Sequence, residues 1–492
     1  MRSLKFLVLT LVSMVAFAAC SEEKRASLVL DKTSLYFSSW EDTQQIISYV
    51  AHDAEYVAVG SISEGWNATV NAATSRIIVI PVGSTDDNIS NDMLSKEGLL
   101  VVNAVNKENQ STSYDINLYI CDTEDIDSEG AANCYVVTKP NTNYTFDAMH
   151  RHDGSELATK SVKLLWQSNP DVVKNVALVE GKAMFYISAS ADDSSRVTDT
   201  NAVVAAYNAK GETIWSWHLW VVNENPLTDT DTYSNGKTFM RKNLGAFTNS
   251  DGSKSEQKIY DSYGMYYQWG RKDPFPRPYY FDASGAESEG WCNEEGTYLS
   301  EDFVARTAKN GTVEYAIKNP MQYIYNDENS EYNGDKGIGV GDWLAVGNGD
   351  DNLWGEDTKS LYDPCPYGWK VPSADDLSVL YLSAQEDATD LEEARKQYGW
   401  RLSAGLSNYF WSACGRRRYT DGKVENMNYK EGVYPSQPQP WEGYYWTSSS
   451  ISADGNAVAL YFDLTTTRLN NKFVGNSPRF RANGFQIRCV KE

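Results

Sequence analysis

The chain has 492 residues, which is enough for roughly three domains. Its 67 acidic and 44 basic side chains give a formal net charge of −23. An acidic excess of this size argues against nucleic acid as a partner and against attachment to an anionic bilayer through charge. Short alternating runs of Val, Ile, Thr and Tyr dominate the chain, whereas helical periodicity is scarce. These observations predict a mostly β, multidomain protein.

The N-terminal segment has the pattern of a secretory leader. Two basic residues precede an apolar run over residues 6–19, which ends in small residues directly before Cys20. We expect a signal peptide over residues 1–19, with acyl chains on Cys20 and a lipidated tether over residues 20–26. The alternative is an uncleaved membrane helix, but the apolar run is shorter than the roughly 20 residues that span a bilayer.

An acidic motif, Ser21-Glu22-Glu23, follows Cys20. This motif resembles the export signal of Bacteroidetes-type surface lipoproteins. The resemblance implies an outer-membrane protein that is held by its lipid anchor and exposed on the cell surface. An anchor that faces the periplasm is the alternative.

Residues 27–121 contain about seven short strand patterns separated by turn residues, which predicts an immunoglobulin-type β-sandwich. The order of these patterns resembles the BACON domain family, whose members are regarded as spacers or glycan-binding modules. The matching segments are 35–37, 66–70, 98–102 and 116–120. The acidic stretch over 122–130 is expected to be a solvated hinge, with a calcium site as the alternative.

Residues 131–224 predict a second β-sandwich. Within it, the run from Trp215 to Trp220 is apolar on both faces of a strand, so we expect both faces to be covered. His218 lies in this run, and we expect a hydrogen-bonded interface histidine rather than a ligand or a base. The module resembles a segment that is common in Bacteroidetes surface lipoproteins.

Residues 225–492 carry five motifs, at 239–246, 266–275, 362–372, 445–449 and 484–490. Their order closely resembles the "major paralogous domain" family (FISUMP). The resemblance implies an α+β, C-type-lectin-like domain without established catalytic residues. The fold class expected for the whole chain is therefore two immunoglobulin-like β-sandwiches followed by a lectin-like domain. Within the third domain, Ser373 is predicted to cap a helix with Asp376 at its third position.

Six cysteines follow Cys20, and they allow 15 disulfide pairings. In the sheet that the FISUMP resemblance implies, the terminal strand closes beside the Asp-Pro-Cys-Pro turn. We therefore expect a disulfide between Cys365 and Cys489. Free buried thiols are the alternative.

Long Gly- and Asn-rich loops over 281–360 and a Pro-rich loop over 435–445 are the expected binding surfaces, because loops on a rigid scaffold often carry function. Five aromatic side chains are the candidate ligand-binding residues: Trp343, Trp354, Trp441, Tyr444 and Tyr445. Packing within the loops is the alternative for each. Four oxygen-bearing residues could hold a structural calcium ion, or could simply form turns: Asp342, Asp350, Asp351 and Asn352.

Motifs of catalysis are missing from the sequence. It has no Gly-x-Ser-x-Gly elbow, no His-Glu-x-x-His and no Walker loop, and only four His. We therefore expect a protein that is not an enzyme, with no catalytic residue and no metal-binding residue assigned. The expected function is binding or adhesion at the cell surface, with glycan recognised through the lectin-like domain. The alternative is a fimbrial tip or accessory subunit of a surface complex, and the third option is a polysaccharide hydrolase.

Overall fold

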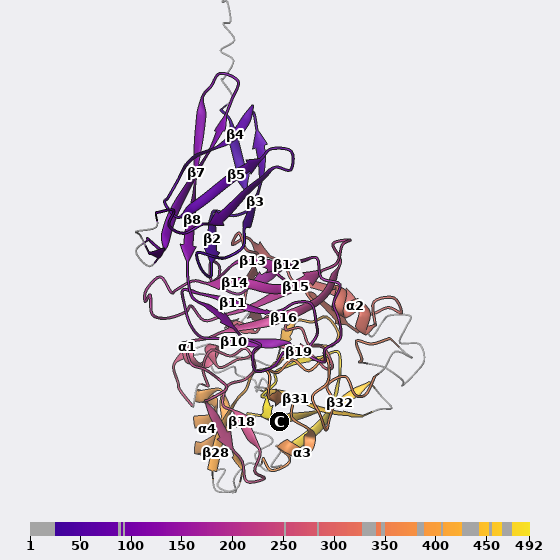
Figure 1. The fold of residues 1–492 in the computed structure, drawn as a ribbon. Coiled ribbons are helices and arrows are strands. Elements are labelled where there is room, and N and C mark those ends of the chain that lie inside the picture. The colour runs from indigo at the N-terminus through magenta and orange to yellow at the C-terminus, as the bar shows by residue number, and fades with distance from the viewer. Residues whose placement is uncertain are drawn as a thin grey trace, which may run out of the picture. The chain divides into compact units, whose positions relative to one another are not determined.

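The computed structural model describes residues 25–86, 90–91, 94–249, 252–282, 285–326, 341–345, 350–380, 388–404, 407–425, 442–451, 455–464 and 475–492. The described chain is mostly β and divides into two compact units (Figure 1). The N-terminal unit is residues 1–120, and the C-terminal unit is residues 121–492. The predicted leader and Cys20 lie outside the described residues. None of the described helices is long and apolar enough to cross a membrane.

The N-terminal unit is a β-sandwich of two four-stranded sheets. One sheet has the order β1 (Ser27–Leu30), β3 (Gln45–His52), β6 (Arg76–Pro81), β5 (Trp66–Asn71), and the other has β2 (Ser34–Phe37), β8 (Ser111–Ile120), β7 (Glu97–Val105), β4 (Tyr56–Ile62). Strand alternation sends Ile47 and Ile77 from one sheet, and Leu100 and Ile116 from the other, into one shared core.

The C-terminal unit begins with a second sandwich. Its six-stranded sheet has the order β10 (Cys134–Val137), β16 (Thr213–Val221), β15 (Thr200–Tyr207), β12 (Ser161–Gln167), β22 (Trp291–Cys292), β23 (Tyr298–Leu299). The facing sheet has β13 (Val173–Val179), β14 (Lys182–Ile187), β11 (Thr142–Asp147), β9 (Thr123–Asp125). Strands β22 and β23 come from beyond residue 224, so the sheet crosses the expected domain boundary.

Strand β16 explains why the expected second and third domains form one compact unit. Trp217 and Leu219 point into the core of the sandwich. Trp220, on the other face, belongs to a second core that also contains Trp269 and Trp446. The strand is therefore covered on both faces, as its apolar pattern predicted. The division expected at residue 224 does not separate two compact units, because the two parts share this core.

The rest of the C-terminal unit combines small sheets with short helices. Its sheets are β17 (Thr230–Thr232), β18 (Thr238–Met240), β35 (Val490–Lys491), β26 (Trp369–Lys370); β19 (Tyr267–Gln268), β34 (Gly484–Phe485), β29 (Arg416–Arg417), β30 (Val424–Glu425); and β31 (Glu442–Ile451), β32 (Asn456–Asp463), β33 (Gly475–Phe480). Paired strands are β20 (Pro278–Asp282) with β21 (Gly285–Ser288), β24 (Asp302–Ala305) with β25 (Gln322–Tyr325), and β27 (Gly399–Ala404) with β28 (Ser407–Ser412). The helices are α1 (Glu256–Asp261), α2 (Val313–Lys318), α3 (Ala374–Leu377) and α4 (Ala388–Gln397).

A disulfide joins Cys365 and Cys489, the pair expected from the sequence. It links the Asp-Pro-Cys-Pro turn to the chain just before β35, and β35 pairs with β26 beyond that turn. The carboxylate of Asp363 fixes the turn, since it accepts hydrogen bonds from the backbone N–H groups of Cys365 and Val371, both at 2.8 Å. Three buried cysteines are free thiols: Cys134, Cys292 and Cys414.

Candidate functional site

Three of the five candidate aromatic side chains lie in the core rather than on a binding surface. Trp343, Trp354 and Tyr445 are at most 1% exposed. The indole N–H of Trp343 donates to the carbonyl of Trp269 at 2.7 Å, and the hydroxyl of Tyr445 donates to the carbonyl of Ser412 at 2.7 Å. The expectation of surface aromatics is wrong for these three. Trp343 and Trp354 lie on segments that pack into the core, and Tyr445 lies on strand β31 rather than on a loop.

The other two candidates have different positions. Trp441 lies outside the described residues. Tyr444 is only 3% exposed, yet it lines the larger of two pockets described below.

Of the residues considered as calcium ligands in the loop, Asp342 and Asp351 are engaged by one arginine, whereas the Asp350 carboxylate accepts the backbone N–H of Asn352 at 2.9 Å, which is turn chemistry. Asp342 Oδ2 lies 3.5 Å from Nη1 of Arg481, and Asp351 pairs with the same guanidinium.

The acidic stretch over 122–130 is not the solvated hinge that we expected, because its residues Thr123–Asp125 form strand β9 and pair with β11. Within it, Asp125 pairs with Lys182 at 2.5 Å. Across the described residues, no group of three or more His, Cys, Asp or Glu side chains could hold a metal ion.

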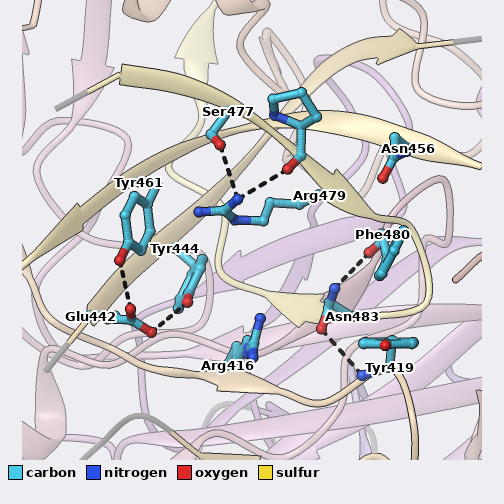
Figure 2. A pocket seen from close by; sticks show the side chains of 11 residues that line it. Arg416, Tyr419, Glu442, Tyr444, Asn456, Tyr461, Ser477, Arg479, Phe480 and Asn483 are labelled. Carbon is cyan, nitrogen blue, oxygen red and sulfur yellow. Dashed lines mark hydrogen bonds between the residues drawn. The ribbon is translucent and has the colours of Figure 1, made fainter. Parts of the chain in front are cut away.

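The larger pocket, called here the tyrosine–arginine pocket, has a volume of about 550 Å³. It lies among β29, β31, β32, β33 and the turn after β33, so its walls come from segments far apart in the sequence (Figure 2). The lining residues are Arg416, Tyr419, Glu442, Tyr444, Asn456, Tyr461, Ser477, Pro478, Arg479, Phe480 and Asn483.

Glu442 organises one side of the pocket. One of its carboxylate oxygens accepts a hydrogen bond from the hydroxyl of Tyr461 at 2.6 Å, and the other accepts one from the hydroxyl of Tyr444 (Figure 2). The two rings lie 5.1 Å apart. Burial, reinforced by the nearby Glu442 charge, raises the pKa of Tyr444 well above its ordinary value. Tyr444 is therefore a neutral donor, and both rings are held in place by their hydrogen bonds to Glu442.

Two arginines flank these rings. Arg479 lies across Tyr461, with its guanidinium carbon 4.5 Å from the ring centroid, and 5.6 Å from that of Tyr444. Arg416 lies 5.4 Å from the centroid of Tyr444, and its Nη2 pairs with Glu425 at 2.5 Å. Cations placed over aromatic faces in this way are held electrostatically.

The opposite side carries half-buried rings. Tyr419 and Phe480 meet edge-to-face with their centroids 4.7 Å apart. Asn483 fixes this pair, because its amide oxygen accepts from the backbone N–H of Tyr419 at 3.1 Å and its amide nitrogen donates to the carbonyl of Phe480 at 2.9 Å. The pocket thus combines aromatic faces with polar groups that are already held in place.

Sequence reasoning singled out only Tyr444 among these lining residues. No other lining side chain was a candidate from the sequence. No sequence pattern shows that β31, β32 and β33 bring their side chains to one pocket.

A second pocket of about 360 Å³ lies elsewhere in the C-terminal unit. Its acidic side chains converge on a buried arginine: Arg277 Nη2 lies 3.0 Å from Glu289 and 3.5 Å from Asp261. The Arg277 guanidinium also stacks on Phe247, 4.0 Å from the ring centroid. Since these charges are largely paired with one another, the tyrosine–arginine pocket is the stronger candidate for a binding site.

Comparisons with known proteins identify no family. No family model and no curated protein matches the sequence. Solved structures with weak similarity include the protocadherin gammaB7 EC3-6 cis-dimer (11% identity, 40% of this chain and 51% of that one, TM-score 0.16). Another is SGBP-B of the Bacteroides ovatus mixed-linkage glucan utilization locus in complex with a mixed-linkage heptasaccharide (11% identity, 41% of this chain and 48% of that one, TM-score 0.13). The chain spans about half the length of each, and similarity at this level supports no argument about function.

Proposed function

We propose that this chain is a non-enzymatic binding protein that recognises a saccharide in the tyrosine–arginine pocket. The observation that carries the proposal is the preformed combination of polar groups and aromatic faces around Glu442. Pockets for drug-like ligands are lined mainly by apolar side chains, whereas most residues that line this one can form hydrogen bonds. A hydroxyl-rich ligand with apolar ring faces, such as a sugar, matches that lining.

The chemistry of the pocket favours binding over hydrolysis. Among the residues described as lining it, Glu442 is the one carboxylate, whereas most glycosidases use a pair. A tyrosine nucleophile would need a lowered pKa or a base that takes its proton, but burial raises the pKa of Tyr444.

A binding experiment tests this proposal. We expect the protein to retain one or more saccharides on a glycan array, and calorimetric titration to show affinity for the same saccharides in solution. Tyr419→Ala should weaken that affinity by roughly three- to tenfold, because one aromatic contact contributes about 1 kcal/mol.

The control variant is Tyr56→Ala in the N-terminal unit, where the side chain is 50% exposed and lines no part of the pocket. This change should leave the affinity unaltered. If wild type binds no saccharide, or if both variants bind as wild type does, the proposal is wrong.

We also propose that acyl chains on Cys20 hold the protein in the outer membrane with its folded units at the cell surface. The leader pattern and the acidic motif after Cys20 support this proposal. Metabolic labelling with palmitate should mark wild type and not Cys20→Ala. Labelling of neither protein would contradict the lipid anchor, and protection of the labelled protein from protease added to intact cells would contradict surface exposure.

A further inference from the structure

The two arginines of the pocket differ in their charge partners. Arg416 is paired with Glu425, so its charge is balanced within the protein. Arg479 has no carboxylate within 4.0 Å among the described residues, and its guanidinium is held by neutral groups only. Its Nη1 donates to the hydroxyl of Ser477 at 2.9 Å and to the carbonyl of Pro478 at 3.1 Å.

The guanidinium of Arg479 also has hydrogen-bonding capacity that the described protein does not use. Its Nε is buried without a partner, and its Nη2 makes no hydrogen bond to any described residue. A polar donor taken out of water without a partner destabilises the folded state. The cation–π contact with Tyr461 offsets part of this loss but leaves the buried Nε–H without an acceptor.

The one carboxylate among the described residues that line the pocket, Glu442, is occupied with other groups. Both oxygens of Glu442 accept hydrogen bonds from tyrosine hydroxyls, and its side chain does not form an ion pair with Arg479. The planar donor fork of an arginine matches the two oxygens of a carboxylate. An acidic group on a ligand would therefore supply the charge partner that Arg479 lacks among the described residues.

The overall charge of the chain makes this arrangement informative. A net charge of −23 repels anions at long range, so affinity for an anion has to come from local contacts. An unbalanced guanidinium inside a pocket supplies such a contact.

We infer that the saccharide bound in the tyrosine–arginine pocket is acidic and that its carboxylate is held by the guanidinium of Arg479. This inference rests on the proposed function and specifies the ligand class, a sugar with a free carboxylate. The aromatic rings and amide groups of the pocket then contact the uncharged part of the same ligand.

The test compares matched probes that differ only in charge. The probes are glucuronate, galacturonate and N-acetylneuraminate, each beside its own methyl ester, titrated calorimetrically in 50 mM salt. Since a hydrogen bond to a charged group is stronger than a neutral one, we expect at least one acid to bind roughly ten- to hundredfold more tightly than its ester. Raising the salt concentration should reduce this difference.

Variants identify the arginine responsible. Arg479→Gln should remove the preference, so that acid and ester bind equally, while Arg479→Lys should keep part of it because charge is retained and the fork is lost. The matched control is Arg418→Gln, which removes an arginine that is already paired with Asp421 and does not line the pocket. It should leave the preference intact, and urea unfolding should confirm that all variants are folded.

Two negative outcomes are distinguishable. If a neutral saccharide binds and Tyr419→Ala weakens it, but no acid is preferred over its ester, the acidic class is wrong and the proposed function stands. An acid preference that persists in Arg479→Gln equally overturns the role of Arg479. If neither acids, esters nor neutral saccharides bind, both the inference and the proposed function are wrong.

Discussion

Breaking the disulfide between Cys365 and Cys489 should remove up to about 5 kcal/mol from the unfolding free energy of the C-terminal unit. The two residues are 124 positions apart, so the bond closes a long loop in the unfolded chain. The chain-entropy relation for such a loop gives a loss of about 4.9 kcal/mol at 25 °C. Measured losses for native disulfides span about 2 to 5 kcal/mol, and a loop of this length predicts the upper end.

The assay is urea unfolding followed by tryptophan fluorescence and far-ultraviolet circular dichroism. Wild type in its oxidised form is compared with wild type reduced in dithiothreitol and with the double variant Cys365→Ala/Cys489→Ala. Reduction leaves both side chains in place, so it separates the cross-link from the cavities that the alanines create. The N-terminal unit contains no disulfide among its described residues, so its transition is an internal reference.

The control variant is Cys121→Ala, which changes a half-buried cysteine outside this disulfide and should leave both transitions in place. The reasoning is refuted if reduction shifts the unfolding free energy of the C-terminal unit by less than about 1 kcal/mol. It is also refuted if both units lose stability equally, since the loop lies wholly within one unit.

Three further predictions concern buried side chains of the same unit. Burial lowers the pKa of His218 to about 3, so the unfolded chain binds the proton first below pH 6.5 and stability falls. His218→Gln should therefore lose about 2 kcal/mol less unfolding free energy between pH 7.5 and 5 than wild type does. Burial raises the pKa of Asp342 to about 6, although Arg481 opposes this, so the folded chain binds the proton first and stability rises as pH falls. Asp342→Asn should lack this gain of about 1 kcal/mol over the same interval, and urea-unfolding profiles parallel to wild type would contradict either assignment. Trp446 is fully buried, so Trp446→Ala should lower the unfolding free energy by about 3 to 5 kcal/mol, and a urea midpoint unchanged from wild type would contradict this.

Local patterns predicted many of the strands. The strand segments expected at 35–37, 66–70, 98–102 and 116–120 fall within β2, β5, β7 and β8. The doubly apolar run at β16 correctly indicated a strand covered on both faces. Strand β4 was missed because its residues, which include Gly60, are mostly half-buried or exposed and show no alternation. Ser373 caps α3 with Asp376 as expected, although the helix has only four residues.

The exposure of aromatic side chains could not be predicted in the same way. Trp343 lies in a Gly- and Asp-rich segment that reads as a surface loop, yet its ring is buried and its N–H bonds to a distant carbonyl. Loop composition reports turn formation, but it does not report whether the loop covers the core. The pocket was missed for a related reason, since Glu442, Tyr461 and Arg479 come together only when three strands pair in register.

The pairing of β12 with β22 determines how short a fragment of the C-terminal unit can be and still fold. A fragment that stopped at residue 224 would expose Trp166, whose ring now lies 5.1 Å from Trp291, together with Trp220 on the outer face of β16. Such a fragment would expose an apolar patch of indole rings to water, and we expect it to self-associate. A gene rearrangement that moved the sandwich without the residues that follow it would expose the same two tryptophans. We therefore expect residues 121–492 to be inherited together as one unit.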